Sequence, residues 1–188
     1  NRLVPFDWDT FFAYEGTVYA VATNARTGEA EYLDCMQMDP KCRILRATCA
    51  LPLLFPVIEW NGREYYDGGL ADSIPIRKAI ADGNEKNLIV LTQPAGFRKE
   101  YQKDYDMVIR LLGRKYPNMV DVLRTRHIRY NEEEDYCEAL EAAGKAVIIR
   151  PRYSLDSMEK DLGQIRLNYG HGYDLAKEKI GEIQSLFR

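Results

Sequence analysis

The segment Glu64-Tyr65-Tyr66-Asp67-Gly68-Gly69 places a carboxylate between two aromatic residues and a pair of glycines. Tyrosine favours β-strands, whereas Asp and Gly are frequent in turns. We therefore expect Asp67 at the end of a strand, where Gly68 and Gly69 leave room for a substrate or another chain segment. A carboxylate in such a place can act as a general base. Because an ordinary turn explains the same residues, the flanking sequence must decide between the two interpretations.

The residues on both sides of Asp67 predict the elements that position it. Phe55–Trp60 and Arg63–Tyr66 are two strand-like runs joined by Asn61-Gly62, a strong signal for a β-hairpin. After the glycines, Ser73 is a candidate N-cap for a helix over Ile76–Ala81. The sequence therefore predicts that Asp67 leaves a hairpin and enters a glycine loop before a helix.

Small residues precede the hairpin in Ala47-Thr48-Cys49-Ala50-Leu51-Pro52, followed by Phe55-Pro56. Together with Asp67-Gly68-Gly69, these motifs resemble the patatin-like phospholipases. That family carries Ala-Ser-x-Ala-x-Pro before its Asp-Gly-Gly, and Thr48 stands here where the family has Ser. The resemblance covers roughly residues 15–95 and fades towards the C-terminus.

The resemblance implies a fold and an activity. The fold would be α/β, a three-layer α/β/α patatin-like sheet with flanking helices that is incomplete at its N-terminal side. Asp67 would be the catalytic aspartate of a Ser–Asp dyad, with Gly68 and Gly69 shaping the site. The substrate would be a lipid or other ester, with phospholipids and lysophospholipids as examples, and neither a metal nor an organic cofactor is implied.

The chain departs from the family pattern at the nucleophile. No Gly-x-Ser-x-Gly occurs, and the serines are Ser73, Ser154, Ser157 and Ser185. We therefore expect residues 1–188 to be the C-terminal part of a single patatin-like hydrolase domain, with a mainly helical extension from about residue 97. This fragment would be inactive alone. A degenerate hydrolase, a non-catalytic α/β binding module and an acyltransferase remain as alternatives.

Two histidines could extend the dyad to a triad. His171 lies between two glycines in what the sequence suggests is a turn, and His127 lies in a predicted helix. Both are better interpreted as structural or solvent-exposed residues. A dyad needs only Asp67 from this chain.

The remaining sequence alternates between strand and helix patterns, which indicates an α/β fold. The run Asn87–Thr92 is apolar enough to predict a strand buried on both faces of a parallel sheet. The other predicted strands are Thr17–Asn24, Ala30–Leu33 and Ala146–Ile149, and the predicted helices are Cys42–Leu51, Lys99–Lys115, Met119–Ala143, Leu155–Tyr169 and Tyr173–Phe187.

Composition limits the classes of function. The net charge of −3 does not favour nucleic-acid binding, and no apolar run reaches the length of a membrane span. We expect a cytoplasmic protein, peripheral at the membrane through transient contacts, whose oligomeric state the sequence leaves open. The basic residues between Arg110 and Arg129 are interpreted as a solvated helical face. The four cysteines lack zinc-site spacing and are expected to be buried free thiols.

Overall fold

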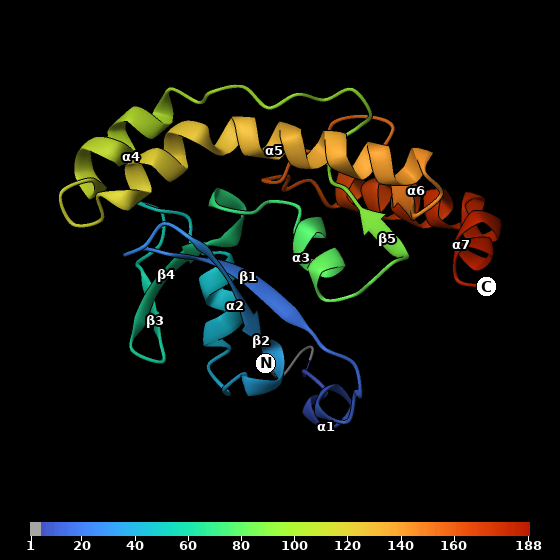
Figure 1. Cartoon of the computed structure of the whole chain (residues 1–188), viewed down its shortest axis with the longest axis horizontal. Helices are drawn as coiled ribbons and strands as arrows, with labels where there is room; N and C mark the ends of the chain where they lie inside the picture. Colours follow the sequence, from blue (N-terminus) through green and yellow to red (C-terminus); the bar gives the residue numbers. More distant parts are fainter. Residues whose placement is uncertain (1–4) are drawn as a thin grey trace. The chain divides into compact units, whose positions relative to one another are not determined.

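A computed structural model describes residues 5–188 and divides the chain into two compact units. The first unit runs to Ser73 and includes Tyr101–Arg126, and the second contains Ile74–Glu100 and His127–Arg188. Each unit combines strands with helices, so the expected α/β fold is confirmed (Figure 1). The long helix α5 (Asn118–Ala142) begins in the first unit and ends in the second.

The first unit is built on a four-stranded antiparallel sheet with the order β2-β1-β4-β3. β1 is central and pairs Ala22 with Asp67 of β4. In the loop between β3 and β4, Asn61 has φ 49° and Gly62 has φ 73°, as the predicted Asn-Gly hairpin turn requires. The elements are α1 (Trp8–Phe12), β1 (Tyr19–Asn24), β2 (Ala30–Asp34), η1 (Cys35–Gln37), α2 (Arg43–Thr48), β3 (Ile58–Trp60), β4 (Arg63–Asp67), η2 (Gly68–Leu70) and α4 (Asp104–Leu112).

The core of the first unit lies between this sheet, α2 and the first part of α5. Small residues in β1 and α2 allow close packing, since Ala22 and Ala47 are fully buried. Larger side chains fill the remaining space, and those that are almost completely buried are Ile44, Tyr65, Leu70, Tyr116, Met119 and Leu123. α4 adds Tyr105, Val108, Ile109 and Leu112, the face predicted from its helical spacing.

The second unit contains a two-stranded parallel sheet formed by β5 (Asn87–Val90) and β6 (Ala146–Ile149). The helices are α3 (Ile76–Ala81), the C-terminal part of α5, α6 (Leu162–Glu178) and α7 (Ile180–Leu186). Buried side chains of α3, α5 and both strands form its core: Ile76, Ile89, Tyr130, Cys137, Leu140 and Ile148.

Three local predictions are wrong. β5 is not buried on both faces, because Leu88 and Val90 are 43% and 68% exposed. The Gly-His-Gly sequence does not form a turn, since α6 continues through it. Ser73 does not cap α3, which begins after Pro75, and its hydroxyl instead donates to the carbonyl of Gly69 at 2.8 Å.

The cysteines and the hydropathy of the helices complete the description. All four cysteines are free, as predicted, but only Cys35 and Cys137 are buried, whereas Cys42 is half-buried and Cys49 is exposed. Within residues 5–188, none of the helices combines the length and hydropathy needed to cross a membrane.

Candidate active site

Asp67 is the last residue of β4, the second strand of the predicted hairpin. It is half-buried, whereas Tyr65 and Tyr66 before it are buried. The strand ends here because the chain turns into the short helix η2, for which Asp67 is the N-cap. This is the strand-end position expected from the sequence.

Hydrogen bonds of both its side chain and its backbone hold Asp67 in place. Its carboxylate accepts the backbone N–H of Gly69 at 2.7 Å, which fixes the orientation of the side chain. Its backbone N–H donates to the carbonyl of Ala50 at 3.0 Å. Its own carbonyl accepts the hydroxyl of the buried Thr23 at 2.7 Å. The carboxylate is therefore carried on a backbone that β1 and the residues after α2 both anchor.

The two glycines meet different restrictions. A Cβ added to Gly68 would lie 2.1 Å from the carbonyl oxygen of Val21, which excludes any side chain. A Cβ on Gly69 would lie 3.1 Å from the Asp67 carboxylate. Gly68 is thus required for packing against β1, and the lack of a side chain at Gly69 avoids crowding of the Asp67 carboxylate.

The small-residue segment lies beside the Asp-Gly-Gly turn. Ala47 and Ala50 are buried, and the Asp67 N–H bond to Ala50 links the two motifs directly. Residues that are far apart in sequence, and on which the family resemblance was based, are therefore neighbours in the structure.

Arg126 of α5 also contacts the turn, which the sequence analysis missed. Its Nε donates to the carbonyl of Gly69 at 2.7 Å, and its Nη1 donates to the hydroxyl of Tyr105 at 2.6 Å. The interpretation of the whole basic cluster as a solvated face is therefore wrong for Arg126. Helical spacing could have identified it, because Arg126 follows the buried Met119 and Leu123 at intervals of four and three residues.

His171 does not lie in the predicted turn, whereas His127 lies in a helix as predicted. His171 lies inside α6, where its Nε2 accepts the Arg152 N–H at 3.0 Å and its ring stacks on Tyr153 with centroids 4.6 Å apart. His127 lies in α5, as expected. The contacts of His171 are those of a structural residue.

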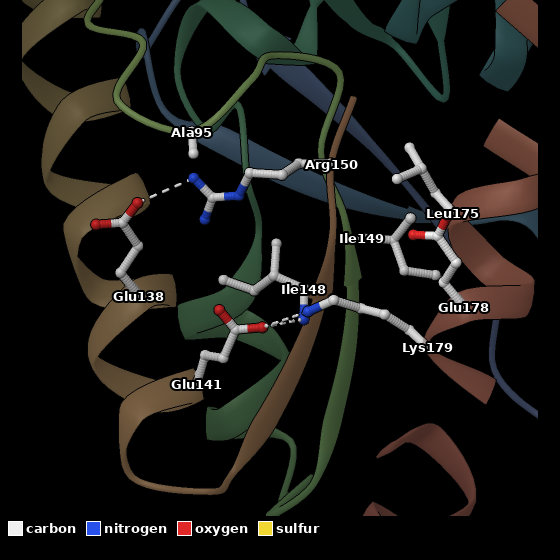
Figure 2. Close-up of a pocket in the computed structure, with 9 residues that line it drawn as sticks. All are labelled: Ala95, Glu138, Glu141, Ile148, Ile149, Arg150, Leu175, Glu178 and Lys179. Carbon is white, nitrogen blue, oxygen red and sulfur yellow. Dashed lines mark hydrogen bonds and ion pairs between the residues drawn. The ribbon is translucent and has the colours of Figure 1, made fainter. Parts of the chain in front are cut away.

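The second unit contains a pocket of about 410 Å³ between α5, β6 and the junction of α6 and α7. Figure 2 shows Glu138 and Glu141 projecting from α5 towards Arg150 and Lys179, at 2.9 and 3.3 Å respectively. No Ser, Thr, Cys or His is among the residues that line this pocket, so it lacks a side chain for acyl transfer. These ion pairs instead join α5 to β6 and to the start of α7.

In this α/β unit, Asp67 at the end of β4 stands beside a close-packed glycine turn. Residues 14–80 match the family model of the patatin-like phospholipases, the family that the motifs of this segment resemble. Residues 116–188 match a domain of unknown function (DUF6363). No curated protein matches the chain.

Proposed function

We propose that this chain supplies the general base of a lipid acyl hydrolase, and that Asp67 is that base in a Ser–Asp dyad. The observation that carries the proposal is the fixed orientation of the Asp67 carboxylate at the end of β4, inside the segment that matches the phospholipase family. A preorganised carboxylate needs no rearrangement before it accepts a proton.

In the proposed reaction, the Asp67 carboxylate accepts the proton of a serine hydroxyl as the serine oxygen attacks the acyl carbonyl. The leaving alcohol then takes up the proton from Asp67, and an acyl-enzyme remains. Water then attacks this ester and loses a proton to Asp67; the bond between the acyl carbon and the serine oxygen breaks, the fatty acid is released, and the serine oxygen takes that proton back from Asp67. Backbone N–H groups must hold the oxyanion at both steps.

We assign the nucleophile to a Gly-x-Ser-x-Gly segment outside these 188 residues. Ser73 is the serine closest in sequence to Asp67, but its hydroxyl donates to the Gly69 carbonyl. Under this proposal, residues 1–188 form part of a hydrolase domain that another segment completes.

Exposed apolar residues in the segment after Ala50 support a lipid substrate. This segment follows the residue whose carbonyl accepts the Asp67 N–H, and it exposes Leu53, Leu54 and Phe55 to 46%, 70% and 55%. Leu53 has φ 68°, a strained conformation for a residue with a side chain. An acyl chain bound there would cover this apolar surface.

A fluorophosphonate probe, which labels activated serines, tests the proposal. The chain alone should remain unlabelled, whereas the protein that includes the Gly-x-Ser-x-Gly segment should be labelled on that serine. Asp67→Asn should slow the labelling, and Asp72→Asn provides a matched control because the Asp72 carboxylate is tied to the hydroxyl of Tyr32 at 2.5 Å. Labelling of Ser73 in the chain alone, or labelling that is insensitive to Asp67→Asn, would refute the dyad.

The absence of Gly-x-Ser-x-Gly from the sequence favours one second candidate, a binding module derived from a hydrolase. Such a module would bind lipid without turnover, and no serine of the complete protein would react with the probe.

A further inference from the structure

Helix α6 exposes a row of apolar side chains to solvent. Leu162, Ile165, Tyr169 and Tyr173 recur at intervals of three, four and four residues, which places them on one face. Their exposed fractions are 70%, 43%, 77% and 54%. We call these four side chains the α6 stripe.

The half-buried side chains of α6 are mostly polar. Gln164 donates to Asn168 at 2.9 Å, and Asn168 also accepts from the hydroxyl of Tyr153 at 3.4 Å. His171 accepts the backbone N–H of Arg152. An amphipathic helix normally turns its apolar face towards the core. Because α6 turns its apolar face outwards, the stripe is suited to contact another body.

The charged residues beside the stripe indicate which kind of surface it contacts. Arg166 and Lys177 are exposed and follow Leu162 and Tyr173 by four residues, so both adjoin the stripe. The Nζ of Lys177 lies 4.6 Å from the centre of the Tyr173 ring. Glu178 is on another side of the helix and is paired with Arg152 at 2.5 Å. The stripe therefore combines apolar and aromatic side chains with flanking cations.

We propose that the α6 stripe docks the protein on the surface of an anionic phospholipid bilayer. Leucine, isoleucine and tyrosine side chains enter the boundary between headgroups and acyl chains, and Arg166 and Lys177 contact the phosphates. The proposal rests on the lipid hydrolase function proposed above, since such an enzyme must find its substrate in a membrane. It assigns this role to the part of the chain that matches the domain of unknown function.

Sedimentation of the full chain with vesicles tests docking without any turnover. The vesicles contain ether-linked phosphatidylcholine, with or without ether-linked phosphatidylglycerol, so that hydrolysis cannot contribute. The wild-type chain should bind the anionic vesicles, and I165Q/Y169Q should lower the partition coefficient roughly tenfold or more, because the two side chains lose most of their apolar contact. Gln keeps the helix propensity high, so circular dichroism should be unchanged.

Leu167→Gln is the matched control. Leu167 is 65% exposed on the same helix, but it lies two residues from Ile165 and so faces away from the stripe. Its replacement should leave vesicle binding unchanged. R166Q/K177Q should reduce binding to anionic vesicles roughly tenfold and remove its dependence on salt.

Three results would overturn the proposal. The wild-type chain could fail to bind vesicles, or I165Q/Y169Q could bind as well as Leu167→Gln does. Analytical ultracentrifugation could instead show a dimer that I165Q/Y169Q dissociates, which would make the stripe a contact between copies of this chain. Hydrolysis of a soluble short-chain ester by the complete protein is measured separately, so a failure of docking is distinguished from a failure of catalysis.

Discussion

Glu31 in the first unit is a half-buried carboxylate, and Glu134 in the second unit is a buried one. Their surroundings differ. Glu31 accepts hydrogen bonds from Asn24, Arg63 and Tyr65 at 2.7, 2.9 and 2.6 Å. Glu134 is 1% exposed, and its carboxylate oxygens accept no hydrogen bond. The nearest cations in its ion pairs are Arg150 at 3.5 Å and Arg98 at 4.0 Å.

The two surroundings move the two pKa values in opposite directions. Burial acts to raise the pKa of Glu31, but the hydrogen bonds from Tyr65, Asn24 and Arg63 outweigh it and lower that pKa. Burial raises the pKa of Glu134, and the attraction of Arg150 and Arg98 does not compensate. The first unit thus provides hydrogen bonds for its half-buried carboxylate, whereas the second unit has a buried carboxylate without hydrogen bonds and an exposed apolar stripe.

The substitution with the largest expected effect tests which unit contains the catalytic residue. In the complete protein, Asp67→Asn should lower kcat for phospholipid hydrolysis by about 10²–10⁴, because the general base is lost. KM should change little, since the carboxylate acts on the serine and not on the lipid. His171→Ala in the second unit should leave most of the activity. Loss of turnover on His171→Ala with little effect of Asp67→Asn would move the site to the other unit.

Gly68→Ala tests how tightly the first unit is packed. The new methyl group would meet the Val21 carbonyl, and the backbone cannot yield without breaking the pairing of β1 with β4. We expect a loss of about 3 kcal/mol or more in the free energy of unfolding, measured with urea. Asp67 should then also lose its position. A wild-type unfolding midpoint would show that this contact is less rigid than described.

The two carboxylates should respond to pH with opposite signs. Glu31 has a lowered folded pKa, so its contribution is present above the ordinary value of 4.5 and is lost as the pH falls through the folded pKa. Glu134 has a raised folded pKa, so its contribution to stability is fully present below pH 4.5 and is lost as the pH rises through the folded pKa.

Substitution by Gln should therefore separate the two residues. At pH 7, Glu31→Gln should destabilise the first unit by roughly 1–3 kcal/mol, whereas Glu134→Gln should stabilise the second by roughly 1 kcal/mol. Arg150 and Arg98 keep Glu138 and Asp135 as partners after the second change. Hydrogen exchange measured at about pH 3, pH 5 and pH 8 covers the range below 4.5 for Glu31 and above 4.5 for Glu134, and it reports on each unit separately. Equal signs for both variants would contradict the comparison.

The smallest effect concerns Gly170 in α6. A Cβ at this position meets no atom within 4 Å, and the residue is inside a helix. Gly170→Ala should therefore stabilise α6 by about 0.5–1 kcal/mol, seen as slower exchange of its amides. A decrease in protection would indicate that the Gly-His-Gly sequence needs flexibility.

The sequence predicted the parts of the fold that depend on local signals. The hairpin around Asn61-Gly62 and the strand Ala146–Ile149 were correct, because turn chemistry and apolar runs act over a few residues. The position of Asp67 at a strand end followed from the same signals. The bonds of Thr23 to Asp67 and of Arg126 to Gly69 did not, because sheet pairing and helix packing bring these residues together over 44 and 57 residues of sequence.

The errors have physical reasons as well. Gly170 and Gly172 suggested a turn, but the cost of glycine in a helix is only about 1 kcal/mol each, and the contacts of His171 and Asn168 hold α6 together. The apolar run of β5 suggested burial on both faces, but hydropathy does not indicate which side of a strand is covered.

The position of helix α5 limits where the C-terminal region could be exchanged between related proteins. The matched C-terminal region starts at residue 116, yet residues 116–126 pack within the first unit, where Tyr116 donates to Glu64 at 3.0 Å and Asn118 donates to the carbonyl of Arg26 at 2.7 Å. An exchange of residues 116–188 as a block would remove these bonds together with the Arg126 contact to Gly69. A breakpoint inside the helix, after Arg126, would instead keep the bonds of Tyr116, Asn118 and Arg126 intact.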